Sequence, residues 1–196
     1  MDRRQMLKQL GLLTAGSLLT RVLDAVAAGT DLHAAPSQSA LTESQRAMVA
    51  RLAEMIIPPT DTPGAADAGV PGFIDRIVST WYTDRERERF LAGLGELDTF
   101  CTTRFSHDFN ACTDAQRAEA LTDAESRASD YRPSPAYLIT AEPDQASPFF
   151  FKLKELTVLG YYSSEIGATK ELAYNPVPGR YDGDYDLAKV GRQWSS

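Results

Sequence analysis

Three copies of one helix-start signal divide the chain between residues 42 and 128. In each copy a threonine, at Thr42, Thr83 or Thr113, is followed three residues later by Gln or Glu. In such a capping box the threonine hydroxyl accepts a hydrogen bond from the third helical amide, and the Gln or Glu side chain binds the amide of the threonine. Each copy therefore predicts a helix start, and we expect this part of the chain to fold as a series of helices.

Apolar residues recur at helical spacing after these signals and in two further segments. The first helix should end at Pro58-Pro59, and the helix after the third signal should end at about Ala128. A helix over 70–81 carries Pro71 in its first turn, where proline is favoured. The stripes expected to be buried are Leu41, Met48, Val49, Leu52 and Ile56, then Val70, Phe73, Ile74, Ile77, Val78 and Trp81, then Phe90, Leu91, Leu94, Leu97 and Cys101. No segment shows strand alternation bounded by turns, so we predict an all-α fold, a compact multi-helix domain.

A last helix is predicted over about 148–164, with Ser147 as its N-cap and Pro148 in its first turn. It is the most apolar of these helices, and its apolar residues go nearly all the way round its circumference. Such a helix is either the central core helix, or it has one face in the core and one in an interface. Both alternatives stay open from the sequence.

Residues 171–196 contain no helical stripe but keep several aromatic residues, and the Pro-rich segment 175–179 forces an extended, turning path. This extended, aromatic-rich C-terminal tail cannot build a core of its own, so it lies on the domain, lies on a partner, or stays loose. Tyr and Trp carry much of the binding energy of interfaces, which favours a partner. The predicted interface residues are Tyr161, Tyr162, Tyr174, Pro178 and Tyr181, with a place in the core as the alternative for Tyr161 and Tyr162.

Residues 1–40 are predicted to be an export signal and a flexible leader, followed by a helical domain over 41–170. Arg3 and Arg4, with Met-Leu-Lys shortly after them, resemble a twin-arginine export signal, which directs folded proteins to the periplasm. The weakly apolar run over 10–19 is too short for a permanent membrane span, and Ala25-Val26-Ala27 offers a cleavage site. The alternative is an amphipathic N-terminal helix that stays attached.

The charge balance excludes two kinds of partner. The 196 residues include 27 acidic and 20 basic side chains, for a net charge of −7, and the first 27 residues are net +2, which leaves −9 for the remainder. A nucleic-acid binder needs a basic face, and an anionic lipid surface repels so acidic a body. We therefore expect no nucleic-acid partner, and membrane association only through partners. The 43% hydrophobic content rules out wholesale disorder.

Few residues that carry chemistry are present. With 2 His and 2 Cys, the chain can form neither a zinc cluster nor a cysteine-rich scaffold. Ser106-His107-Asp108 offers a hydroxyl, an imidazole and a carboxylate, but neighbours in sequence do not adopt the geometry of a catalytic triad. We predict no catalytic, cofactor-binding or metal-binding residue on this chain.

Cys101 and Cys112 form an even pair in a chain predicted to be exported, which favours a disulfide bond between them. Closing so short a loop would stabilise the fold by about 3 kcal/mol. The alternative is two free thiols, because the twin-arginine route folds proteins before export.

Two sets of motifs resemble those of a known family. The first is the loop Pro58-Pro59-Thr60-Asp61-Thr62-Pro63-Gly64-Ala65, which continues through Val70-Pro71-Gly72-Phe73-Ile74-Asp75. The second runs from Phe149-Phe150 through Gly160-Tyr161-Tyr162-Ser163-Ser164 to Pro176-Val177-Pro178-Gly179. With the arginine pair, these motifs resemble the gluconate 2-dehydrogenase subunit 3 family, the small (gamma) subunit of periplasmic flavin-dependent sugar dehydrogenases, over most of residues 41–183. Asp184 departs from the family pattern, where a Cys is expected, which argues against a tail disulfide there.

The resemblance implies that this chain is not an enzyme by itself but a subunit of an oxidoreductase complex. In such complexes a large flavoprotein of the glucose-methanol-choline type holds FAD and oxidises a sugar or sugar acid, and a cytochrome c subunit with haem c takes the electrons. The small subunit helps the large one to fold, to take up flavin and to leave the cell, because its twin-arginine signal carries both. Two other classes stay open: a free-standing periplasmic enzyme, and a self-contained periplasmic binding or structural helical domain.

Overall fold

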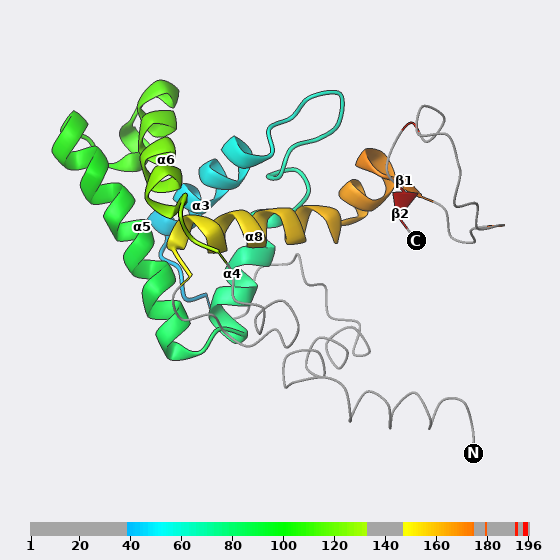
Figure 1. The fold of residues 1–196 in the computed structure, drawn as a ribbon, viewed down its shortest axis with the longest axis horizontal. Coiled ribbons are helices and arrows are strands. Elements are labelled where there is room, and N and C mark those ends of the chain that lie inside the picture. The colour runs from blue at the N-terminus through cyan, green and yellow to red at the C-terminus, as the bar shows by residue number, and fades with distance from the viewer. Residues whose placement is uncertain (1–38, 133–146, 175–178, 180–190, 192–193, 196) are drawn as a thin grey trace, which may run out of the picture.

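The helices that follow the three capping boxes begin where the sequence predicts. The computed structural model describes residues 39–132, 147–174, 179, 191 and 194–195 (Figure 1). The three helices are α3 (Glu43–Ile56), α5 (Asp84–Phe105) and α6 (Asp114–Ala128). Their N-caps are Thr42, Thr83 and Thr113, and both reciprocal hydrogen bonds of each box are present. These bonds satisfy amides that a helix start otherwise leaves without a partner.

Two further helices begin without a side-chain cap. Helix α4 (Val70–Thr80) follows Gly69, whose φ of 73° lies in the left-handed region that favours glycine. Helix α8 (Phe149–Tyr162) has Pro148 as its N-cap, not Ser147, so the sequence-based expectation was wrong by one residue. The reason is that Pro148 itself has the extended backbone of a cap, with ψ of 153°.

The sequence did not predict several short elements. They are a 3₁₀-helix η1 (Phe109–Ala111), a π-helix η2 (Gly167–Glu171), and the strands β1 (Ala173–Tyr174) and β2 (Trp194–Ser195), which pair in parallel. Elements of two to five residues are too short to show a periodic pattern. Among the described residues the layers of the domain are helical, which confirms the predicted all-α class.

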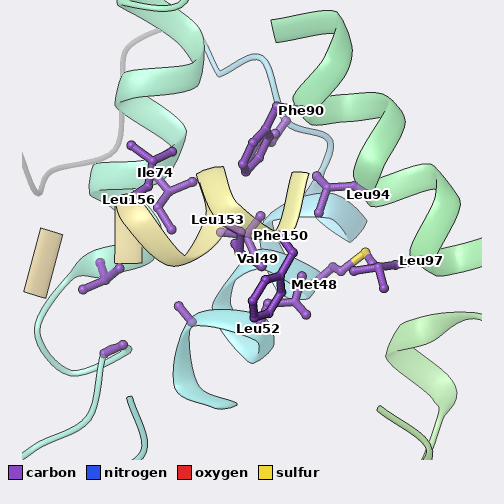
Figure 2. Packing of buried hydrophobic residues seen from close by; sticks show 14 of the residues in the cluster. Met48, Val49, Leu52, Ile74, Phe90, Leu94, Leu97, Phe150, Leu153 and Leu156 are labelled. Carbon is purple, nitrogen blue, oxygen red and sulfur yellow. The ribbon is translucent and has the colours of Figure 1, made fainter. Parts of the chain in front are cut away.

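Helix α8 crosses the middle of the domain and contacts α3, α4, α5 and α6 (Figure 1). Figure 2 shows its side chains Phe150, Leu153 and Leu156 among apolar side chains from α3, α4 and α5. Most residues of the predicted stripes are buried in this core, including Val49, Ile74, Leu94 and others of the same helices. One face of α8 therefore lies in the core, as both alternatives from the sequence require.

Several predictions fall outside the described residues. Arg3 and Arg4, with the whole predicted export signal, are among them, and so are Pro178 and Tyr181. In the part of the chain that the structure describes, no helix is both long and apolar enough to cross a membrane.

Candidate partner-binding site

Helix α8 is apolar on its outer side as well as on the side that enters the core. Val158, Leu159 and Tyr162 are 38%, 55% and 43% exposed, and they are the large hydrophobic residues that the described part of the chain leaves exposed. Their spacing places them on one side of the helix. Apolar residues grouped on a surface mark sites of protein contact. These three residues are called the outer face of α8 below.

Gly160 fixes the rotation of α8 about its own axis. A Cβ atom at this position would lie 2.7 Å from Cδ1 of Phe73 in α4, so only a glycine lets the two helices approach this closely. On the same inner side, the fully buried Thr157 satisfies its hydroxyl by donating to the carbonyl oxygen of Leu153 at 2.8 Å. Because these contacts set the inner side, the outer face cannot turn into the core.

The two adjacent tyrosines of α8 have different surroundings. Tyr161 is 1% exposed, and its hydroxyl donates a hydrogen bond to the carbonyl oxygen of Pro63 at 2.8 Å. Its ring therefore has no free surface for a partner, which corrects the expectation that Tyr161 is an interface anchor. Tyr162 lies on the outer face, with its ring edge-on to that of Tyr161 at a centroid distance of 5.4 Å. Of the two, only Tyr162 is placed where a partner could reach it.

The loop over 58–64 is held firmly at its base and exposed at its tip. The hydroxyl of Thr62 donates to Oε2 of Glu171 at 2.6 Å, which adds a second link to the one from Tyr161. Gly64 is packed so tightly that a Cβ there would lie 2.6 Å from Oε1 of Glu54. Residues 58–61 are exposed. The loop thus presents a fixed tip beside the C-terminal end of α8.

The turn that ends α8 is built from two small residues. Ser164 donates through its hydroxyl to the carbonyl oxygen of Tyr161 at 2.6 Å and accepts from the amide of Gly167 at 3.0 Å. A Cβ on Gly167 would overlap the carbonyl oxygen of Tyr161, so this position requires glycine. The turn leads into η2, which carries Glu171 to its contact with the loop.

A shallow groove lies beside the outer face, between α3, α6 and α8. It has a volume of about 330 Å³ and an apolar floor that includes Met55, Ile56, Leu121 and Phe150. Lys154 of α8 and Glu125 of α6 form its charged rim, 3.9 Å apart. Since Lys154 and Val158 are one helical turn apart, the groove and the outer face adjoin. The sequence did not reveal this groove, because its residues come from three helices.

Partly buried polar groups surround the start of α8. Lys152 and Glu155 form an ion pair at 3.0 Å with side chains 16% and 32% exposed, and burial raises the pKa of the Glu155 carboxyl. Burial also raises the pKa of Tyr82, with further contributions from the carboxylates of Glu155 and Glu86. The Tyr82 hydroxyl is buried without a hydrogen-bond partner among the described residues. The N-terminal end of α8 packs against α5 through the ring of Phe149, whose centroid lies 5.3 Å from that of Phe90.

Four further residues singled out by the sequence fall within the described part of the chain: Cys101, Cys112, His107 and Tyr174. Cys101 and Cys112 are both buried and free in the structure, and the disulfide bond between them stays a prediction. His107 is exposed, with Nδ1 2.7 Å from the carbonyl oxygen of Ser106. The backbone of Tyr174 lies in β1, while its side chain is outside what the structure describes. Within the described ranges, no group of three or more His, Cys, Asp and Glu side chains is arranged to hold a metal ion.

A helical domain with an apolar helix face left open has the form of a subunit that binds another chain. Residues 43–179 match the family model described as Gluconate 2-dehydrogenase subunit 3. The match covers more than half of the chain, so the chain belongs to the gluconate 2-dehydrogenase subunit 3 family, as the motifs implied. The family takes its name from one subunit of a gluconate dehydrogenase complex. No curated protein and no solved structure matches the chain.

Proposed function

We propose that this chain is the non-catalytic small subunit of a periplasmic, FAD-dependent sugar or sugar-acid dehydrogenase, and that it binds the large flavoprotein subunit through the outer face of α8. The observation that carries the proposal is the exposure of Val158, Leu159 and Tyr162 on a helix whose opposite side is core. Family membership supports the existence of a partner, because subunit 3 is by its name one part of a larger enzyme.

The outer face is the centre of the proposed interface and not its full extent. Specific interfaces bury about 800 Å² on each partner, which is more than three side chains provide. The groove beside Lys154 and the exposed loop tip over 58–61 supply further area around it. Fully burying one large apolar side chain contributes roughly 1.5–3 kcal/mol, and aromatic residues at the centre dominate binding. Leu159 and Tyr162 are therefore the expected anchors.

The proposed division of labour leaves redox chemistry to the partners. The flavoprotein, of the glucose-methanol-choline type, holds FAD and oxidises the substrate, and a cytochrome c subunit with haem c accepts the electrons. This chain contributes contact area that stabilises the folded flavoprotein by mass action. Covering an apolar surface of a folding partner also favours flavin loading, which is the chaperone-like part of the proposal.

Export is the second contribution in this proposal. The arginine pair Arg3-Arg4 and the apolar run after it support a twin-arginine signal on this chain. Because that route carries folded proteins, a flavoprotein bound to α8 would reach the periplasm together with the chain that bears the signal. The flavoprotein would then fold and load its cofactor before export.

The test is to purify the tagged full-length chain from its native host and record the absorbance of flavin and haem. Reduction of a dye with gluconate, glucose, fructose or lactose then identifies the substrate. We expect a yellow complex that contains a second, larger chain. A colourless chain that turns over a substrate by itself would contradict the proposal.

Two variants locate the interface within the same experiment. Leu159→Asp and Tyr162→Asp place a charge at the centre of the outer face, and we expect at least a ten-fold loss of co-purified flavin. Ala92→Asp introduces the same charge at an exposed position on α5 and is the matched control. Equal flavin recovery from all three variants would show that the partner binds elsewhere on the chain.

A further inference from the structure

The two cysteines lie together in the corner where α5, η1 and α6 meet. Cys101 is in α5, Cys112 follows η1 directly, and they are 0% and 2% exposed. The Sγ of Cys112 donates to the carbonyl oxygen of His107 at 3.9 Å. Burial, with the neighbouring thiol of Cys112 as a second cause, raises the pKa of Cys101 to about 12. A thiol in this state is a poor nucleophile at neutral pH, since the thiolate is the reactive form.

Arg117 of α6 binds η1, the segment that comes directly before Cys112. Its Nε donates to the carbonyl oxygen of Phe109 at 3.0 Å, and a terminal nitrogen donates to that of Asn110 at 2.6 Å. Its guanidinium also lies 5.9 Å from the centre of the Phe109 ring, which is itself fully buried. One buried side chain thus holds the η1 segment against α6.

Two neighbouring helices hold η1 from the other sides. The amide of Phe109 donates to Oδ1 of Asp98 in α5 at 2.9 Å. The side-chain amide of Asn110 donates to the carbonyl oxygen of Ser44 in α3 at 3.1 Å. Because α3, α5 and α6 all bind this segment, exposing the thiols requires several contacts to break together.

We propose that Cys101 and Cys112 are an oxidation site whose final state is set by the order of folding and oxidation. A chain that meets a disulfide-containing oxidant while unfolded forms the Cys101–Cys112 bond. A chain that folds first buries both thiols and keeps them reduced. The redox state of the pair then records whether the chain folded before it met the oxidant.

The chemistry is ordinary thiol–disulfide exchange. The thiolate of one cysteine attacks a sulfur of a small disulfide, which forms a mixed disulfide and releases one thiolate. The thiolate of the other cysteine then displaces the second thiolate and closes the intramolecular bond. The two cysteines lose two protons and two electrons, and the small disulfide accepts them to become two thiols.

The experiment uses the purified full-length chain, reduced, with oxidised glutathione as the oxidant. One sample is exposed while folded and the other in urea, followed by refolding in the oxidant. The oxidant is then removed and both samples are denatured, so that N-ethylmaleimide can block every free thiol, and the products are counted by mass. We expect two blocked thiols in the folded sample and the internal bond in the refolded one, with at least ten-fold slower oxidation of the folded chain. Equal rates, or no internal bond after refolding, would overturn the proposal.

A pair of variants tests whether the corner is the barrier. Arg117→Lys removes the planar donors that bind two carbonyl groups, and we expect faster oxidation of the folded chain than in wild type. Arg104→Lys alters an exposed arginine on α5, whose side chain is 63% exposed, and is the matched control. If Arg117→Lys does not fold, the comparison of folded and unfolded wild type still decides the proposal. A folded Arg117→Lys chain that oxidises no faster than the control would contradict the role of the corner.

Discussion

The hydroxyl of Tyr161 donates a hydrogen bond at 2.8 Å to the carbonyl oxygen of Pro63, a residue 98 positions earlier in the chain. This bond joins the end of α8 to the base of the loop over 58–64. The contact between Thr62 and Glu171 joins the same loop to η2. The proposed partner surface is therefore preformed on both sides of this bond, which reduces the ordering cost of binding.

Tyr161→Phe should loosen the loop without disrupting the core. The ring stays buried, and only the hydroxyl is lost, so we expect a loss of about 0.5–1.5 kcal/mol in the free energy of unfolding. Urea denaturation measures this loss, and hydrogen exchange at residues 60–66 should accelerate. Tyr162→Phe, on the outer face, is the control and should change stability by less than about 0.5 kcal/mol. Equal effects of the two variants would contradict a structural role for the bond to Pro63.

Gly160→Ala should destabilise the protein, because the added methyl group would meet the ring of Phe73 at 2.7 Å. Overpacking of this kind costs about 1–3 kcal/mol. Gly95→Ala is the matched control on α5, where a Cβ meets nothing within 4 Å. It should stabilise the protein by about 0.5–1 kcal/mol, because alanine is the better helix former. In thermal unfolding, Gly160→Ala should lower the melting temperature and Gly95→Ala should raise it if α8 and α4 pack as described.

Arg117→Ala should be the more damaging of two arginine substitutions. It leaves the carbonyl group of Asn110 without its side-chain donor and that of Phe109 with only the amide of Cys112 at 3.3 Å, and we expect a loss of about 2–4 kcal/mol in the free energy of unfolding. Arg104→Ala removes an exposed ion pair to Glu119, and should cost less than about 1 kcal/mol. Urea denaturation of the reduced proteins compares them directly. Similar losses would show that η1 does not depend on Arg117.

Glu155 should make stability depend on pH. Burial raises the pKa of its carboxyl, so the folded chain holds this proton more tightly than the unfolded chain does. The contribution is complete below the pKa of an unfolded glutamate, about 4.3, and is lost as the pH rises through the folded pKa. We expect the unfolding free energy of wild type minus that of Glu155→Gln to fall as the pH rises above about 4.3. Glu165→Gln, at an exposed position, controls for the change in net charge. A difference that rises with pH would contradict the prediction.

The helix starts could be predicted from sequence because their determinants are local. Thr42, Thr83 and Thr113 each bind within a few residues of themselves, so the same bonds form whatever the rest of the chain does. The stripes around Val49, Ile74 and Leu94 predicted the core for a related reason, since a helix with one apolar side must bury it. The end of α6 at Ala128 was also predicted correctly.

The candidate site could be predicted only in part. The all-round apolarity of α8 indicated that one side could be an interface, but not which side. The groove beside Lys154 and the links from the loop to Tyr161 and Glu171 join residues from distant parts of the chain. No local pattern encodes such contacts, and they follow from how the helices pack.

By itself, the sequence determined that this protein is a set of capped helices with one unusually apolar member, and its motifs determined the family. Only the tertiary structure decided which of Tyr161 and Tyr162 faces outward. The two residues are adjacent, so they point about 100° apart around the helix, and either could have been buried. The close approach of Gly160 to Phe73 set the rotation of α8, which buried Tyr161 and left Tyr162 with Val158 and Leu159 at the surface.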